Sequence, residues 1–257
     1  MAKGASMKFV SYEETVPKLL ELVNLAKELP KHDKIILKVA LKNSDSNNPE
    51  NTKVEFAEQV LRFCLKNKNP VAEVFIAEGA DGKETMELFD LLGYRNLAEK
   101  YSIGLVDLND TEVESVALFK LLKMEKIMYP RILKEGFIIS LPALAPSEEY
   151  LMSASLSNML GAYPSKYYQG FFSTSKNKIK KYAPKYAIHD ILRCKMPEFA
   201  IIDASGKGKL LAGIPIDMDR QAAKLLDVAP ENVAYLSFIE ETFGIKEQGA
   251  DPIGSYR

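Results

Sequence analysis

The chain has 257 residues, and its 34 basic and 35 acidic side chains leave a formal net charge of −1. Because this balance supplies no overall field for a polyanion, nucleic acid is not expected as a partner. The longest apolar runs, residues 137–145 and 199–204, are far shorter than the ~20 residues that a membrane helix needs. We therefore expect no membrane partner, and a start without a signal-peptide pattern favours a cytoplasmic location.

No stretch of linker composition divides the chain, so the sequence predicts a single compact α/β domain over residues 1–257. Residues 1–7 match no element and are expected to be disordered or tag-like. The two cysteines, Cys64 and Cys194, lie far apart within helical patterns, which favours core packing in a reducing compartment. The absence of tryptophan and the abundance of lysine and glutamate hint at a thermophilic source.

Apolar segments alternate with amphipathic ones along the first half of the chain, which is typical of a mainly parallel or mixed sheet flanked by helices. The predicted strands of this half are residues 8–12, 34–41, 71–77, 103–108 and 137–141. The predicted helices are residues 15–29, 53–66, 84–92 and 148–160. The strand at 34–41 is almost continuously apolar, as a strand buried on both faces should be.

The second half is harder to interpret. Residues 163–185 form an irregular insertion that is rich in aromatic side chains and lysine. Regular patterns then return as a helix at 187–194, a strand at 199–203, a glycine-bearing loop through 213, and helices at 220–226 and 232–243.

Three motifs have a plain structural interpretation that we favour over a functional one. Residues 206–209 (GKGK) follow a strand, but the spacing does not match a phosphate-binding loop, so a simple turn is favoured. The lysine run at 176–185 is favoured as a solvated face rather than a nucleic-acid surface. The two histidines, His32 and His189, offer little material for a metal site, and no metal site is predicted.

Polar groups at strand ends are the stronger candidates for a site. Glu78 and Asp203 each end a predicted strand, where a carboxylate serves as acid, base or metal ligand if the strands are neighbours. The alternative is that each carboxylate caps a helix or a turn. The polar loop at 42–52 leaves the carboxyl end of another strand, where α/β sheets bind ligands, although we favour a simple connection there.

Several segments together carry a family pattern. They are Lys38 in its strand, residues 74–79 (VFIAEG), 105–109 (LVDLN), 157–164 (SNMLGAYP) and 201–204 (IIDA). With these segments the chain resembles the domain of unknown function 362 (DUF362), a family whose members are often joined to ferredoxin-like iron–sulfur modules. The family has no general assigned reaction, so the resemblance leaves open whether this chain is an enzyme.

The chain also departs from that family pattern. Ala143, Ala145 and Ser147 stand where the resemblance implies two lysines and a histidine, and Ser157 stands where it implies a lysine. A basic cluster of that kind at strand ends would suit an anionic ligand. The cysteines of the iron–sulfur module are absent, so this resemblance implies a divergent member for which no iron–sulfur cluster is expected.

Two hypotheses of different classes follow. In the first, the chain binds a small anionic or metal-associated ligand, with the cofactor unknown, in a polar cleft at the carboxyl ends of the strands. The candidate ligand-binding residues are Lys38, Glu78, Asn158, Lys166 and Asp203. In the second, the chain is a noncatalytic scaffold or subunit with a decayed family site that contacts a protein partner, or a second copy in a homodimer, through residues 163–186.

Overall fold

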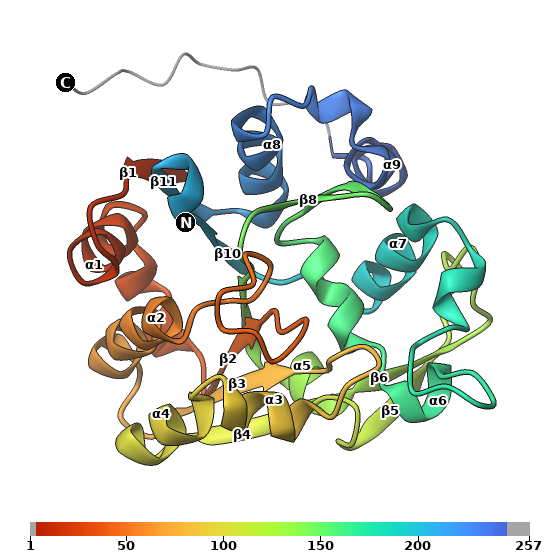
Figure 1. Cartoon of the computed structure of the whole chain (residues 1–257), viewed down its shortest axis with the longest axis horizontal. Coiled ribbons are helices and arrows are strands. Elements are labelled where there is room, and N and C mark those ends of the chain that lie inside the picture. The colour runs from red at the N-terminus through yellow and green to blue at the C-terminus, as the bar shows by residue number, and fades with distance from the viewer. Residues whose placement is uncertain (1–3, 246–257) are drawn as a thin grey trace.

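The computed structural model describes residues 4–245 and places a seven-stranded sheet at the centre of the molecule (Figure 1). In spatial order the strands are β1 (Ala5–Lys8), β11 (Lys209–Gly213), β10 (Phe199–Ala204), β7 (Phe137–Leu141), β2 (Lys34–Val39), β3 (Glu73–Glu78) and β4 (Gly104–Asp107). The strands from β10 to β4 are mutually parallel, whereas β11 and β1 pair antiparallel at one edge. The predicted α/β fold with a mixed sheet is confirmed.

Helices cover both faces of the sheet (Figure 1). One face packs against α1 (Tyr12–Leu22), α2 (Val54–Asn67), α3 (Thr85–Leu91) and α4 (Tyr94–Tyr101). The other face packs against α7 (Pro184–Cys194), α8 (Pro215–Leu225) and α9 (Ala234–Phe243). The middle of β2 is continuously apolar because Ile35 and Leu37 enter the first core while Ile36 enters the second.

Shorter elements connect these layers. Two small hairpins pair β5 (Val113–Val116) with β6 (Ile127–Pro130) and β8 (Ala145–Ser147) with β9 (Leu151–Ser153). Short helices are α5 (Arg131–Glu135) and α6 (Ser165–Tyr168), and the 3₁₀ turns are η1 (Leu25–Lys27), η2 (Leu29–Lys31), η3 (Ser157–Ala162), η4 (Ile179–Lys181), η5 (Ser205–Lys207) and η6 (Pro230–Asn232). Within residues 4–245, no helix combines the length and the apolar character needed to cross a bilayer.

The amino-terminal expectations need correction. The expectation that residues 1–7 are disordered is wrong for residues 5–7, which belong to β1, while residues 1–3 lie outside the described residues. The long-range pairing of β1 with β11 orders this segment, and its partner lies about two hundred positions away along the chain, with Ala5 opposite Ala212. The strand predicted at 8–12 is wrong beyond Lys8, where β1 ends, because the following helix starts at Tyr12 on the N-cap Ser11.

Two predictions in the second half are wrong for tertiary reasons. Residues 148–160 do not form a helix, because β9 pairs with β8 and the Asp219 carboxylate accepts hydrogen bonds from the backbone N–H groups of Ser155 (2.8 Å) and Leu156 (3.1 Å). The glycine-bearing loop before residue 213 is largely strand β11, which pairs with β10 on one side and β1 on the other. In both cases the deciding partner is distant in sequence.

Candidate functional site

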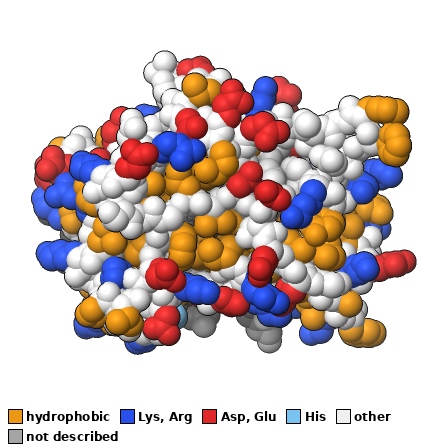
Figure 2. Space-filling model, turned by 90° about the horizontal axis from the view of Figure 1, so that it is seen from below, with side chains coloured by type: hydrophobic (Ala, Val, Ile, Leu, Met, Phe, Trp, Pro, Cys, Tyr) orange, Lys and Arg blue, Asp and Glu red, His pale blue; other side chains and the backbone are white. Residues whose placement is uncertain are grey.

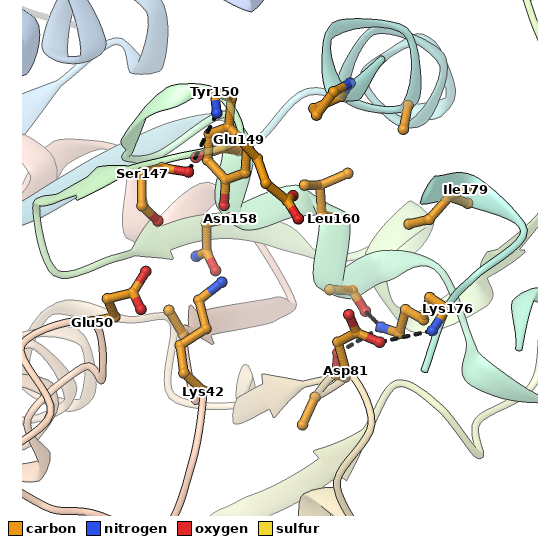
Figure 3. A pocket seen from close by; sticks show the side chains of 18 of the residues that line it. Lys42, Glu50, Asp81, Ser147, Glu149, Tyr150, Asn158, Leu160, Lys176 and Ile179 are labelled. Carbon is orange, nitrogen blue, oxygen red and sulfur yellow. Dashed lines mark hydrogen bonds between the residues drawn. The ribbon is translucent and has the colours of Figure 1, made fainter. Parts of the chain in front are cut away.

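A cavity of about 510 Å³ opens beyond the carboxyl ends of β2 and β3 (Figure 3). Four segments line it: residues 40–50 after β2, residues 78–81 after β3, residues 147–161, and residues 176–187. Ligands of open α/β sheets bind in this position, outside the carboxyl ends of parallel strands. The loop at 42–52, for which a simple connection was favoured, contributes Lys42 and Glu50 to the wall.

A buried ion pair lies beneath this cavity, and its carboxylate partner, Glu78, lines it. The Nζ of Lys38 lies 2.9 Å from Oε2 of Glu78, and the two side chains are 0% and 4% exposed. The same Nζ donates to the backbone oxygen of Val39 (2.8 Å) and to Oδ1 of Asn158 (3.0 Å). Three acceptors therefore match the three N–H groups of an ammonium. Burial lowers the pKa of Lys38, and the Glu78 carboxylate opposes that shift.

Asn158 ties this pair to the neighbouring strand. Its Nδ2 donates to the backbone oxygen of Lys38 (2.9 Å) and to Oγ of Ser140 on β7 (3.0 Å). The residue lies in η3 and its side chain faces the cavity in Figure 3. Lys38, Glu78 and Asn158 are thus three predicted site residues that the structure brings together from three separate segments.

Gly161 is required by the close approach of η3 to the ion pair. A Cβ atom at this position would lie 2.5 Å from Oε1 of Glu78 and 2.7 Å from Nζ of Lys38. Real Cβ atoms essentially never make contacts this short, and both neighbours are held by hydrogen bonds. The glycine therefore lets the backbone of η3 cover the ion pair directly.

Lys176 is a second buried lysine at the cavity, with 2% of the residue exposed. Its Nζ donates to the backbone oxygens of Gly79 (2.6 Å) and Gly161 (3.2 Å), and its backbone N–H donates to Oδ1 of Asp81 (2.7 Å). Burial lowers the pKa of Lys176 to about 7; Lys38 adds to this lowering, while Glu78 and Asp81 oppose it. No described residue forms a salt bridge with this amine.

The mouth of the cavity carries further charges (Figure 3). Lys42 and Glu50 lie across from Asp81, whose carboxylate pairs with Lys180 at 2.6 Å. Desolvation lowers the pKa of Lys42, but Tyr150, Glu50 and other acidic groups outweigh it and raise the value. Among the described residues, the Lys42 ammonium has no hydrogen-bond or ion-pair partner.

Two other predicted site residues lie outside this cavity. Lys166 is in α6 on the surface, where its Nζ lies 3.4 Å from both Asp110 Oδ1 and the backbone oxygen of Thr111. Asp203 ends β10, two strands away from β2, and accepts hydrogen bonds from the Tyr12 hydroxyl (2.6 Å) and the backbone N–H of Ser205 (2.9 Å). The carboxylate of Asp203 thus caps a turn, which was its alternative interpretation.

Three cavity residues, Lys42, Asp81 and Tyr150, were not singled out from the sequence as site residues. Lys42 and Asp81 follow β2 and β3 directly, so the rule that drew attention to Glu78 applies equally to them. Lys176 begins the lysine run at 176–185, and the solvated face expected for that run is wrong at this residue, because its amine is buried against the backbone oxygens of Gly79 and Gly161. Within residues 4–245, no group of three or more His, Cys, Asp or Glu side chains is placed to hold a metal ion.

Comparisons with known proteins identify the fold and the family. A solved structure, the lactate racemase apoprotein from Thermoanaerobacterium thermosaccharolyticum, is similar with a TM-score of 0.53 at 16% sequence identity. The alignment covers 88% of this chain and 57% of that chain, so the chain spans little more than half of the neighbour's length, and the likeness shows a shared fold. No curated protein matches. The family model of DUF362, a domain of unknown function, matches residues 35–223, and the chain belongs to that family.

Proposed function

We propose that this chain binds a small polar molecule with at least one anionic group, a carboxylate or a phosphate, in the cavity at the ends of β2 and β3. The observation that carries the proposal is the Lys42 ammonium, which lines the cavity and has no ion-pair partner within the described residues, whereas Lys180 on the opposite wall is paired with Asp81. An ammonium at a cavity mouth forms charge-assisted hydrogen bonds with an incoming anion.

The acidic side chains of the cavity define the rest of the ligand. Glu78 and Asp81 are already paired with Lys38 and Lys180. Glu50 and Glu149 also line the cavity, and their carboxylates accept hydrogen bonds from hydroxyl or amine groups. The cavity volume of about 510 Å³ falls within the usual range for metabolite sites. A compact molecule with an anionic end and several hydroxyl or amine donors fits this lining.

The similar solved structure is named for lactate, a small carboxylate. Organic acids therefore come first in the ligand panel, followed by phosphorylated metabolites, nucleotides and divalent metals. A ligand that binds only the folded state raises its stability by about 2.7 kcal/mol at 100 times the dissociation constant. Thermal unfolding of the chain against this panel detects such a ligand.

The variant Lys42→Met then tests the site with isothermal titration calorimetry. Removing a charge-assisted hydrogen bond is expected to weaken anion binding by roughly tenfold to a hundredfold. Lys181→Met is the matched control, because Lys181 is an exposed lysine in the same wall segment that does not line the cavity. A panel without any stabilising ligand, or equal affinities for the two variants, would count against the proposal.

A scaffold role is the second candidate, and one observation favours it. Phe171 and Phe172 are 94% and 96% exposed, with ring centroids 4.9 Å apart. Exposed aromatic pairs are typical anchors of protein interfaces. On the face shown in Figure 2, basic and acidic side chains are interspersed. That face therefore carries no large patch of a single charge that would serve as a docking surface. Sedimentation of the wild type and a Phe171→Ser/Phe172→Ser variant tests self-association.

A further inference from the structure

The two buried lysines of the site differ in the number of acceptors around their amines. Lys38 has three acceptors, two from side chains and one from the backbone. Lys176 has two, both backbone carbonyls, at Gly79 and Gly161. A protonated lysine has three N–H donors, whereas a neutral amine has two N–H groups and one lone pair. The surroundings of Lys38 thus match an ammonium, and those of Lys176 match a neutral amine.

The third tetrahedral direction of the Lys176 amine has no partner among the described residues, and this side chain lines the cavity. Figure 3 shows Lys176 beside Asp81 on one wall, with Lys42 on the wall across from them. A molecule whose anionic group meets Lys42 therefore extends toward the amine of Lys176. The lone pair of that amine is available to an electrophilic atom of the molecule.

Burial keeps a fraction of this amine in its neutral, nucleophilic form. Burial lowers its pKa to about 7, so close to half of the molecules carry the neutral form at neutral pH. Desolvation and a nearby cation are the two features that activate lysine nucleophiles, and the nearby cation here is Lys38. Lys42 has no such lowered pKa, because Tyr150, Glu50 and other acidic groups outweigh its desolvation and raise the value. Lys38 lacks a free direction because all three donors are used.

We propose that Lys176 is a nucleophile that forms an imine with an aldehyde or ketone group of the ligand in this cavity. For an anionic carbonyl compound, such as a 2-oxo acid, this inference rests on the proposed function. The Nζ lone pair forms a bond to the carbonyl carbon, and the carbonyl π electrons move to the oxygen, which takes up one of the two protons of the amine. The resulting carbinolamine loses its hydroxyl group together with the second N–H proton as water while the C=N bond forms, so no oxidant or reductant is consumed.

Borohydride trapping of the full chain tests this proposal. Three probes separate anion binding from imine formation. They are 2-oxobutanoate, 2-hydroxybutanoate, which has the same charge but no ketone group, and butanal, which has an aldehyde group but no charge. Reduction converts an imine into a stable secondary amine, which intact-mass spectrometry detects and peptide mapping locates. We expect one adduct from 2-oxobutanoate on Lys176 and none from 2-hydroxybutanoate. Mapping on the wild-type chain identifies the lysine even if Lys176→Met fails to fold.

Calorimetry measures whether the two acids bind, and it distinguishes a failure of the anion site from a failure of the nucleophile. If both acids bind but 2-oxobutanoate gives no adduct on Lys176, the nucleophile is overturned while the anion site stands. If neither acid binds but butanal labels Lys176 ahead of all other lysines, the anion site fails and the nucleophile stands. The proposal that Lys176 is a nucleophile is overturned if the label spreads evenly over surface lysines and if Lys176→Met reduces the labelling no more than Lys181→Met does.

Discussion

The Lys38 ammonium and the Glu78 carboxylate lie 2.9 Å apart at the ends of two adjacent parallel strands, and both are almost fully buried. Taking two charges out of water is costly, so such a pair is stable only with good geometry and additional hydrogen bonds. Val39 and Asn158 supply those bonds to the ammonium, and the backbone N–H of Gly79 donates to the other oxygen of Glu78. Each charge therefore depends on the other for its burial.

The first prediction concerns that dependence. Glu78→Ala leaves a buried, unpaired ammonium, and we expect it to lower the free energy of unfolding by about 3–5 kcal/mol. The double variant Lys38→Met/Glu78→Leu removes both charges and is expected to recover most of that loss. Urea unfolding followed by circular dichroism measures both. A single variant as stable as the wild type would mean that water reaches Lys38 in solution.

The site residues that could be predicted from the sequence are those at or near the carboxyl ends of predicted strands. Lys38 and Glu78 belong to strongly apolar strands, and parallel strands bring their carboxyl ends to one edge. Asp203 satisfied the same rule, yet it lies two strands away, because the order of strands in the sheet cannot be read from their order in the chain. The rule identifies the edge of the sheet, and the strand order decides which residues on that edge meet.

Lys176 shows why the rest of the site could not be predicted. Its amine contacts the backbone oxygen of Gly79, ninety-seven positions away, and the surrounding segment has no periodicity that would place it. The helix predicted at 148–160 failed for a related reason, because Asp219 and β8 hold that segment in another conformation. The local sequence pattern predicts the structure of a segment that buries a regular apolar face. It does not predict a segment whose conformation is fixed by single long-range hydrogen bonds.

A second prediction concerns Gly161. A methyl group there would collide with the buried Lys38–Glu78 pair, so Gly161→Ala is expected to destabilise the fold by about 1–3 kcal/mol, as overpacking of a rigid core does. Gly206→Ala is the matched control, because a Cβ at Gly206 meets nothing within 4 Å. Urea unfolding of both variants provides the comparison. Equal stability of the two would show that η3 can move away from the ion pair at little cost.

A third prediction is a pH dependence of stability. In the unfolded chain Lys176 has an ordinary lysine pKa of about 10.4, whereas in the folded chain its pKa is lowered to about 7. Between these values the unfolded state binds more protons, so this group makes stability rise with pH; below about pH 7 both states are protonated and the cost of burial is fully present. The contribution approaches about 1.4 kcal/mol per pH unit.

The variant Lys176→Met isolates that contribution. Urea unfolding at several pH values between about 7 and about 10 gives the slope for each protein. We expect the wild-type slope to exceed that of the variant across this window, whereas Lys181→Met should keep the wild-type slope because Lys181 is exposed. Parallel slopes for the wild type and Lys176→Met would show that the folded amine titrates like an ordinary lysine.

The last prediction separates Asp203 from the binding site. Burial and the Asp203 carboxylate raise the pKa of Tyr12, so its hydroxyl stays protonated and donates to Asp203 at 2.6 Å. Asp203→Asn weakens this charged hydrogen bond and is expected to cost about 1–3 kcal/mol of stability without changing anion affinity. Lys42→Met should do the reverse, because Lys42 is exposed at the cavity mouth and has no partner within the described residues. Calorimetry and urea unfolding on both variants test this crossed pattern. If Asp203→Asn weakened binding as much as Lys42→Met, the ligand would have to extend past β7 to β10, and the site would be larger than the cavity described.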